Sequence, residues 1–255
     1  MPKPQSPIQI TPLGDSALLI RLRDDFADAD QTLNAVLAAE RALEAAQLPG
    51  VIELAPAYTT VAVFYDPVCT AKAGAPVDAI FSWLEQQIRA ALVEARIVSR
   101  RTGGATRRAL KDSHRGNRAI EIPVCYDPEF ALDLEHVARH ARLSPREAVD
   151  LHSTTEYRVS CIGFTAGFPY LSGLPAQLAT PRRATPRKEI PAGSVAIGGT
   201  QTGIYPIKSP GGWNVIGRTP LRLFDPAKNL PALLRAGDRV RFRAITREEF
   251  AGSTM

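Results

Sequence analysis

The sequence predicts an α+β protein in which a split βαβ sheet is followed by a β-barrel or β-sandwich. Three observations indicate this class: strand and helix patterns alternate at the start, a basic segment interrupts them, and glycine and proline are dense from residue 160 to 220. We therefore expect an α+β domain over 1–95, a basic linker over 96–118 and a β-barrel domain over 119–250.

The first domain is expected to begin with two strands, at residues 8–11 and 17–22, separated by turn-forming residues. Leucine and valine then recur at helical spacing between Leu33 and Leu43. Gly50, which follows a proline, marks the end of this helix.

The rest of the first domain is again expected to contain two strands followed by a helix. Residues 51–55 and 60–65 are rich in strand-forming side chains. An apolar stripe then predicts a long amphipathic helix that opens at Pro76. With 120–124 as a further strand, the order from Ala17 is β-α-β-β-α-β, and this last strand is expected to pair with the N-terminal sheet.

The segment 96–118 is strongly basic. It holds eight Lys and Arg residues against a single Asp, a net charge of +7. Since the whole chain carries +5, the remainder is slightly acidic at −2. Few of its residues are apolar, so we interpret it as an exposed linker. No aromatic side chains are interleaved with its arginines, so nucleic acid is not an expected partner.

The second domain begins with two short helices, expected at 133–140 and 144–152. Ser144, with a proline after it and Glu147 three positions on, has the pattern of a capping box. Between residues 160 and 220 there are 10 Gly and 8 Pro, but aromatic and branched residues are regularly interspersed. Short strands joined by turns explain this composition better than disorder does. A last strand is expected at 239–244.

Composition limits the class of protein. With 45% hydrophobic and 22% charged residues, the chain is typical of a folded globular protein. No stretch approaches the roughly 20 apolar residues of a membrane span, so no membrane association is expected. The three cysteines are far apart, and the proline-rich start has no apolar run of a signal peptide. These features predict a cytoplasmic protein.

Familiar catalytic and metal-binding motifs are missing. The string from Gly198 to Gly203 has half of a phosphate-binding loop, but Ile-Tyr follows where Lys-Ser/Thr is required. His136 and His140 share a helix face, yet arginines flank them and no third ligand is adjacent, so no metal is predicted. Cys161 lies in an apolar run and is interpreted as an inert buried thiol.

The strongest local signal is a set of dense, turn-rich strings. Their glycines let a backbone approach a ligand and present N–H groups to an anion, and their cations can clamp phosphate or carboxylate. Judged on the residues alone, an equal alternative is that the glycines only turn barrel corners and the cations only solubilise a loop. The strings occupy residues 163–171, 181–188, 190–195, 209–213 and 216–220.

Further short matches accompany these strings in order, at residues 14–17, 49–51, 65–67, 122–126, 152–153 and 156–159. Together they resemble the family of the 5-oxoprolinase B subunit, also called allophanate hydrolase subunit 1. That family includes a bacterial sporulation-kinase inhibitor and is similar to part of the carboxyltransferase domain of urea carboxylase. The resemblance covers most of the chain, and several motifs in order are far more specific than any single glycine pattern.

The resemblance implies a cyclophilin-like β-barrel after the α+β domain. It also implies one component of a heteromeric enzyme, inactive alone, which acts with the homologous C subunit and with the A subunit to hydrolyse 5-oxo-L-proline to L-glutamate. ATP would be the co-substrate, accompanied by Mg²⁺. Two alternatives remain open: an inhibitory module that binds a sensor histidine kinase, and a component of an allophanate- or urea-type amide hydrolase or carboxyltransferase.

Within this framework the strings and nearby residues supply the expected site residues. His152 is the candidate acid–base residue. The cations are expected to neutralise phosphate or carboxylate, and the glycines to add N–H donors. The expected binding residues are Arg182, Arg187, Lys188, Gly198, Gly199, Gly211, Gly212 and Arg218.

Overall fold

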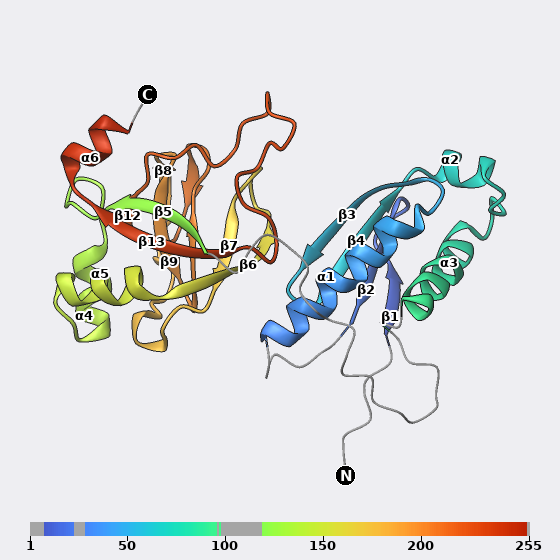
Figure 1. Ribbon diagram of the computed structural model, residues 1–255, viewed down its shortest axis with the longest axis horizontal. Helices are drawn as coiled ribbons and strands as arrows, with labels where there is room; N and C mark the ends of the chain where they lie inside the picture. Colours follow the sequence, from blue (N-terminus) through green and yellow to red (C-terminus); the bar gives the residue numbers. More distant parts are fainter. Residues whose placement is uncertain (1–7, 23–28, 96, 98–118, 254–255) are drawn as a thin grey trace, which may run out of the picture. The chain divides into compact units, whose positions relative to one another are not determined.

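The computed structural model describes residues 8–22, 29–95, 97 and 119–253. The expected basic linker, apart from Ile97, lies outside these residues. The chain divides into two compact units, Met1–His114 and Arg115–Met255, and each is described by itself (Figure 1).

In the first unit the strands form an antiparallel sheet in the order β1-β2-β4-β3. Helix α1 joins β2 to β3, which run parallel to each other with β4 between them, so this is a split βαβ arrangement. Helices α1 and α3 pack against each other and contribute to the core on the sheet (Figure 1). The elements of this unit are β1 (Gln9–Pro12), β2 (Ala17–Arg21), α1 (Ala29–Ala46), β3 (Val51–Ala57), β4 (Thr60–Tyr65), α2 (Pro67–Lys72) and α3 (Ile80–Glu94).

The periodicity of the sequence explains the core of this unit. Leu18 and Ile20 alternate along β2, and Leu84, Ile88 and Leu92 follow at intervals of four along α3; all five are fully buried. Each such side chain contributes about 1.5–3 kcal/mol by leaving water. The apolar stripe was therefore interpreted correctly, although α3 begins at Ile80 and not at Pro76.

One expected strand pairing is wrong. The strand expected at 120–124 is β5 (Ile120–Cys125), but its two neighbours are β13 (Arg239–Ile245), in parallel, and β12 (Asn214–Arg218), antiparallel. It therefore belongs to the barrel and not to the N-terminal sheet. The strand β2 pairs with β1 on one side and with β4 on the other, so neither edge of β2 is left for a later strand.

Glu40 gives the first unit an expected pH dependence. Burial, reinforced by the charge of Glu44, raises the pKa of Glu40 to about 7. The folded state therefore binds more protons than the unfolded chain between about pH 4.5 and 7, so stability should fall as the pH rises through this window. We expect Glu40→Gln to raise stability at pH 8 by about 1 kcal/mol, allowing for partial solvent screening. Urea unfolding at pH 5 and pH 8 measures this, and the exposed Glu94→Gln is the matched control. Equal effects of the two substitutions at pH 8 would contradict the prediction.

The second unit is built around a closed barrel of seven strands in the order β6-β13-β5-β12-β9-β10-β7, with β7 returning to pair with β6. A small separate ladder joins β8 and β11. The α+β class and the expected barrel are confirmed. The remaining elements are α4 (Leu134–Ala141), α5 (Pro145–Thr154), β6 (Glu156–Ile162), β7 (Pro169–Ser172), a 3₁₀ turn (Ala176–Leu178), β8 (Arg187–Ile190), β9 (Ser194–Gly198), β10 (Gln201–Ile204), β11 (Ser209–Gly211) and α6 (Arg247–Gly252).

Local signals set the helices of the second unit. Helix α5 starts where expected: the Ser144 side chain accepts from the N–H of Glu147, and Glu147 accepts from the N–H of Ser144, which confirms the capping box. Helix α5 packs on β13 and helix α4 on β12, over a core built from strands and helices alike. Across the described parts of the chain, no helix combines the length and apolar character needed to cross a membrane.

Candidate functional site

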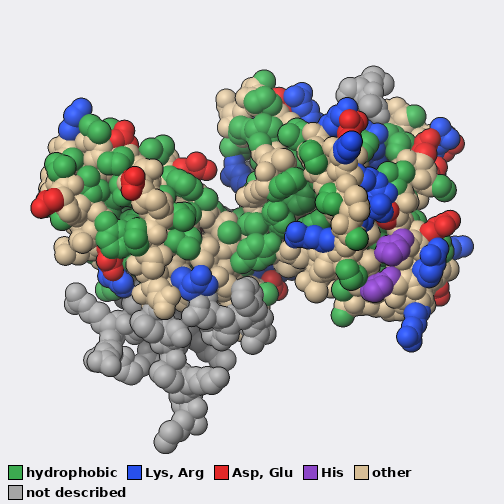
Figure 2. Space-filling view, turned by 180° about the vertical axis from the view of Figure 1, so that it is seen from behind, with side chains coloured by type: hydrophobic (Ala, Val, Ile, Leu, Met, Phe, Trp, Pro, Cys, Tyr) green, Lys and Arg blue, Asp and Glu red, His purple; other side chains and the backbone are tan. Residues whose placement is uncertain are grey.

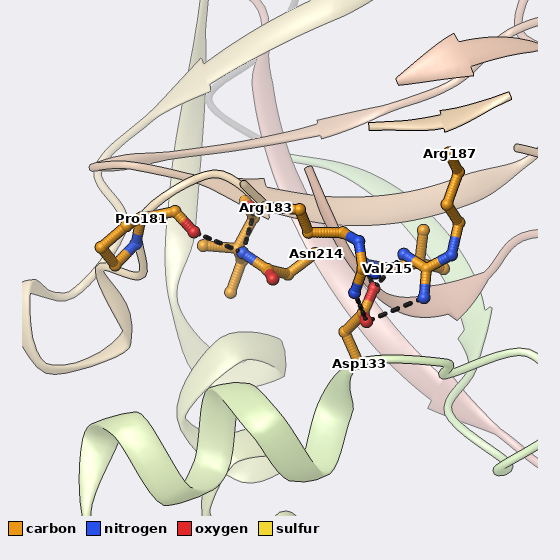
Figure 3. Close-up of polar contacts among 7 residues, drawn as sticks. Asp133, Pro181, Arg183, Arg187, Asn214 and Val215 are labelled. Carbon is orange, nitrogen blue, oxygen red and sulfur yellow. Dashed lines mark hydrogen bonds and ion pairs between the residues drawn. The ribbon is translucent and has the colours of Figure 1, made fainter. Parts of the chain in front are cut away.

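The most concentrated polar arrangement of the second unit surrounds Asp133, just before α4. Its carboxylate accepts two hydrogen bonds from Arg187, at 2.6 and 2.9 Å, and one from Arg183 at 2.7 Å (Figure 3). The backbone N–H of Val215 donates a fourth at 2.8 Å. A bidentate arginine–carboxylate pair is among the strongest side-chain contacts, and it fixes the plane of the guanidinium.

Asp133 is ionised despite its burial. Only 4% of its side chain is exposed, and this desolvation opposes ionisation. The hydrogen bonds from Arg187 and Val215, and the charges of both arginines, outweigh burial and hold the pKa of Asp133 below its usual value. The site therefore contains a buried anion between two partly buried cations.

The chain from Pro181 to Arg187 is held in place by backbone contacts. The Arg183 N–H donates to Gly212 O at 2.8 Å. The amide of Asn214 donates to Pro181 O at 2.9 Å (Figure 3) and to Ile197 O at 3.2 Å. Arg187 then opens β8 and lies opposite Gly211 of β11. These contacts bring both arginines to the start of α4, about fifty residues away in sequence.

An aromatic cluster lies beside this segment. The rings of Phe168, Tyr170 and Trp213 contact one another edge to face or tilted, at centroid distances of 4.9–5.8 Å. The guanidinium of Arg182 lies 5.7 Å from the centre of the Trp213 ring, within the range of a cation–π interaction. Tyr205 packs on Phe168 at 5.1 Å. Arg182 is therefore an exposed cation supported by a packed aromatic surface.

Phe164, at the tip of the β6–β7 hairpin, is the exposed member of the same cluster. Its side chain is 62% exposed, and its backbone φ of 65° is in the left-handed region that favours glycine. It contacts Phe168 and Tyr205 edge to face. A strained, exposed aromatic residue contributes little to folding and is typical of a contact surface.

The structure separates the predicted cations into two kinds. Arg187 is engaged by Asp133, whereas Arg182 and Lys188 are exposed. Arg218 lies at the far end of β12 from Asn214, where its Nε donates to Ala192 O at 2.8 Å. Arg182, Arg187 and Lys188 therefore belong to one segment of the chain, whereas Arg218 contacts the turn that follows β8.

The structure explains why glycine stands at several of the predicted binding positions, which the sequence did not reveal. A Cβ on Gly198 would collide with the Trp213 ring, and a Cβ on Gly211 would collide with the hydroxyl of Tyr205. The N–H of Gly199 already donates to Thr180 O at 2.8 Å. Gly212 contributes its carbonyl to Arg183. These contacts indicate that the glycines allow close packing, and they do not indicate a set of N–H groups that points toward an anion.

His152 lies in the core and not at the surface. Only 1% of it is exposed, and its ring stacks on Phe242 at 4.5 Å. Thr202 donates its hydroxyl to Ala196 O, so His152 Nε2–H must donate to Thr202 Oγ1 at 3.1 Å. Nδ1 then accepts from the hydroxyl of Tyr126 at 2.9 Å. Burial lowers the pKa of His152 to about 3, so the neutral ring is held by two hydrogen bonds. This environment favours a structural role over acid–base catalysis.

The two histidines of α4 do not form a metal site with other described side chains. His136 and His140 are exposed on α4, where Figure 2 shows two neighbouring imidazoles in purple. Within the described residues, no group of three or more His, Cys, Asp or Glu is placed to hold a metal ion. The N–H of Gly199 is bonded to Thr180 O, so this group is not a donor for the phosphates of ATP, and no ATP-dependent step is assigned to it.

Asp133 and Arg183 are the site residues that sequence reasoning missed. Asp133 is the first residue of the helix expected at 133–140. An aspartate at a helix start commonly caps it, but the carboxylate of Asp133 makes no capping hydrogen bond and instead accepts from the arginines. Arg183 was one of several cations in its string, with nothing to single it out. Only the three-dimensional structure, in which Asp133 pairs with both Arg183 and Arg187, identifies these two residues.

Comparison with known proteins identifies the family. Residues 8–234 match the family described as carboxyltransferase domain, subdomain C and D. The chain is 43% identical over 242 residues to the 5-oxoprolinase B subunit of Bacillus subtilis (strain 168), and the match covers 95% of each protein. The solved structure of TTHA0988 has a TM-score of 0.69 and 33% identity over 91% of this chain, which spans 40% of that one.

The fold extends to more distant proteins. The K. lactis urea amidolyase has a TM-score of 0.68 at 17% identity, over 96% of this chain and 15% of that protein. This likeness concerns the fold alone. The family match and the identity to the B. subtilis protein carry the assignment. The chain therefore belongs to the family of the carboxyltransferase domain, subdomains C and D, as a homologue of the 5-oxoprolinase B subunit.

Proposed function

We propose that this chain is the B subunit of an ATP-dependent 5-oxoprolinase, which acts with the C and A subunits to hydrolyse 5-oxo-L-proline to L-glutamate. The single observation that carries the proposal is the 43% identity to the B. subtilis B subunit over 95% of both proteins. A relative named as one lettered component of an enzyme implies further components, so the chain is proposed to be inactive alone.

The chemistry of the substrate sets what the complex must do. The ring of 5-oxoproline is closed by an amide bond, which resists attack by water. ATP, with Mg²⁺, supplies the activation by phosphorylating the lactam oxygen. For this chain we propose a binding role, in which the exposed cations Arg182 and Lys188 neutralise negative charge on a ligand. The packed rings of Phe168 and Trp213 keep Arg182 in place.

Reconstitution tests the proposal. We expect the chain, purified with the C and A subunits, to release glutamate from 5-oxoproline only when ATP is present, and the chain alone to release none. No release by the complete complex would contradict the proposal. Turnover of allophanate or urea in its place would favour the amide hydrolase alternative, and inhibition of a sensor histidine kinase without any turnover would favour the inhibitory module.

The role of the exposed cations is a separate prediction. Arg182→Ala and Lys188→Ala should each lower kcat/KM of the complex by about 10- to 150-fold, because each removes a charge-assisted contact worth roughly 1.5–3 kcal/mol. Both side chains are exposed, so the melting temperature should be unchanged. The exposed Lys228→Ala is the matched control. If both variants were as active as the control variant, Arg182 and Lys188 would not be part of the binding site.

A further inference from the structure

Two arginines of the second unit are held side by side by one carboxylate. Arg187 contacts both oxygens of Asp133, and Arg183 contacts Oδ1 (Figure 3). The three residues come from two parts of the chain: Asp133 precedes α4, and both arginines belong to the segment that leads into β8, with Arg187 as the first residue of that strand. Because Asp133 also accepts from the backbone N–H of Val215, the carboxylate itself is fixed to β12. The positions of both guanidiniums are thereby set before any ligand arrives.

The two arginine side chains are partly exposed, whereas the carboxylate is buried. The side chain of Asp133 is 4% exposed, whereas those of Arg183 and Arg187 are 34% and 22% exposed. Asp133 uses only a minority of the N–H donors that two guanidiniums carry. One further donor, Arg183 Nε–H, is buried with no acceptor among the described residues. The exposed part of the cluster therefore consists of arginine side chains, which carry more N–H donors than Asp133 uses, and the carboxylate is buried.

The charge of this cluster limits the ligand it suits. Two guanidiniums and one carboxylate leave a single net positive charge. A single carboxylate matches this charge and the planar fork of an arginine. The phosphates of ATP carry several negative charges and would call for more cations than the cluster retains. Arg182 and Lys188, which are exposed, are the residues that remain for such a ligand.

We infer that Arg183 and Arg187 form a carboxylate subsite and that Asp133 is the positioning residue that holds them. The inference rests on the proposed function, since the carboxylate in question is that of 5-oxoproline, and it deepens that function by naming where the substrate is recognised. Asp133 acts through the arginines and does not touch the substrate. The amide ring would then extend away from the pair.

The test separates recognition of the carboxylate from folding. Arg183→Lys keeps a cation beside Asp133 but removes the planar fork and Nε–H, so the fold should survive. In the reconstituted complex we expect it to raise the KM for 5-oxoproline about tenfold and to leave the KM for ATP within about twofold. Asp133→Asn should change the KM for 5-oxoproline in the same direction. Arg243→Lys is the matched control, since Arg243 also pairs with a carboxylate, that of Glu121, on the same unit.

A binding titration of the same complexes provides a second readout. The probes are 5-oxoproline and 2-pyrrolidinone, which has the same lactam ring without the carboxylate. The wild-type complex should bind 5-oxoproline about tenfold more tightly than 2-pyrrolidinone. Arg183→Lys should abolish this preference and leave the affinity for 2-pyrrolidinone unchanged. A preference that survives in Arg183→Lys overturns the subsite, as does an equal loss of affinity for both probes.

These outcomes distinguish the inference from the proposed function. If the Arg183→Lys complex is active with a wild-type KM for 5-oxoproline, the subsite is wrong and the 5-oxoprolinase activity stands. If the wild-type complex shows no turnover, the proposed function is wrong. In that case the titration still decides the subsite, because complexes that bind neither probe, or that bind both equally, overturn it. Should Asp133→Asn fail to fold, Arg183→Lys alone carries the test.

Discussion

Replacing Asp133 with alanine is expected to destabilise the barrel unit by about 3–5 kcal/mol. The substitution leaves two partly buried guanidiniums side by side without their counter-ion, and it also leaves the N–H of Val215 without an acceptor. The cost of an unpaired buried group exceeds the net value of the pair itself. This is the largest effect expected for any polar side chain of the site.

Tryptophan fluorescence can measure this effect. The chain has two tryptophans, Trp83 in the first unit and Trp213 beside the site. In a Trp83→Phe background, the fluorescence of Trp213 reports urea unfolding of the barrel unit alone. Glu121→Ala is the control, because it also breaks an ion pair with an arginine, but both partners are about half exposed. It should cost less than about 1 kcal/mol. A similar loss in both variants would show that Asp133 does not anchor the site.

The pH dependence of Asp133 follows from the same contacts. Its pKa is lowered on folding, so its contribution to stability is present above the pKa of the unfolded chain and is lost as the pH falls through the folded value. The loss therefore begins below about pH 4, near the ordinary value of 3.8. Asp133→Ala should flatten this acid limb of the stability profile.

Local patterns in the sequence predicted local structure well. The capping box of α5 and the strand β13 formed where the pattern placed them, and so did the helix α3 except for its start, because each depends on neighbours within a few residues. The pairing of β5 was not predictable in the same way. A strand pattern indicates that a segment is extended but does not name its partner, and β5 found its partner β13 more than a hundred residues later.

At the site, too, the sequence predicted local features but not contacts between distant residues. The sequence singled out the segment 181–188 by its cations and prolines. It did not show that one of those cations, Arg187, is paired with a buried aspartate fifty-four residues earlier. It also indicated a chemical role for His152, whereas the fold places that ring among Tyr126, Thr202 and Phe242. Burial is a property of the whole barrel, so a single residue type in a motif does not reveal it.

His152 makes the barrel unit sensitive to acid. Its pKa falls from 6.5 to about 3 on folding, because burial penalises the charged ring. Between these values the unfolded chain binds a proton that the folded chain does not, so stability should fall by about 1.4 kcal/mol for each pH unit below about 6.5. His152→Leu removes this titration, and the loss of stability between pH 6.5 and pH 4.5 should become much shallower.

At pH 7.5 the same substitution should instead cost about 2–4 kcal/mol, because it removes two hydrogen bonds and leaves the hydroxyl of Tyr126 without its acceptor. The exposed His140→Leu is the control and should leave both the slope and the stability near wild type. A catalytic His152 would give the opposite pattern: a fully stable variant at pH 7.5 whose complex has lost turnover. Because the ring is buried, neutral and hydrogen-bonded at both nitrogens, we expect any loss of activity in His152→Leu to follow the unfolded fraction, and low temperature or a stabilising ligand to restore it.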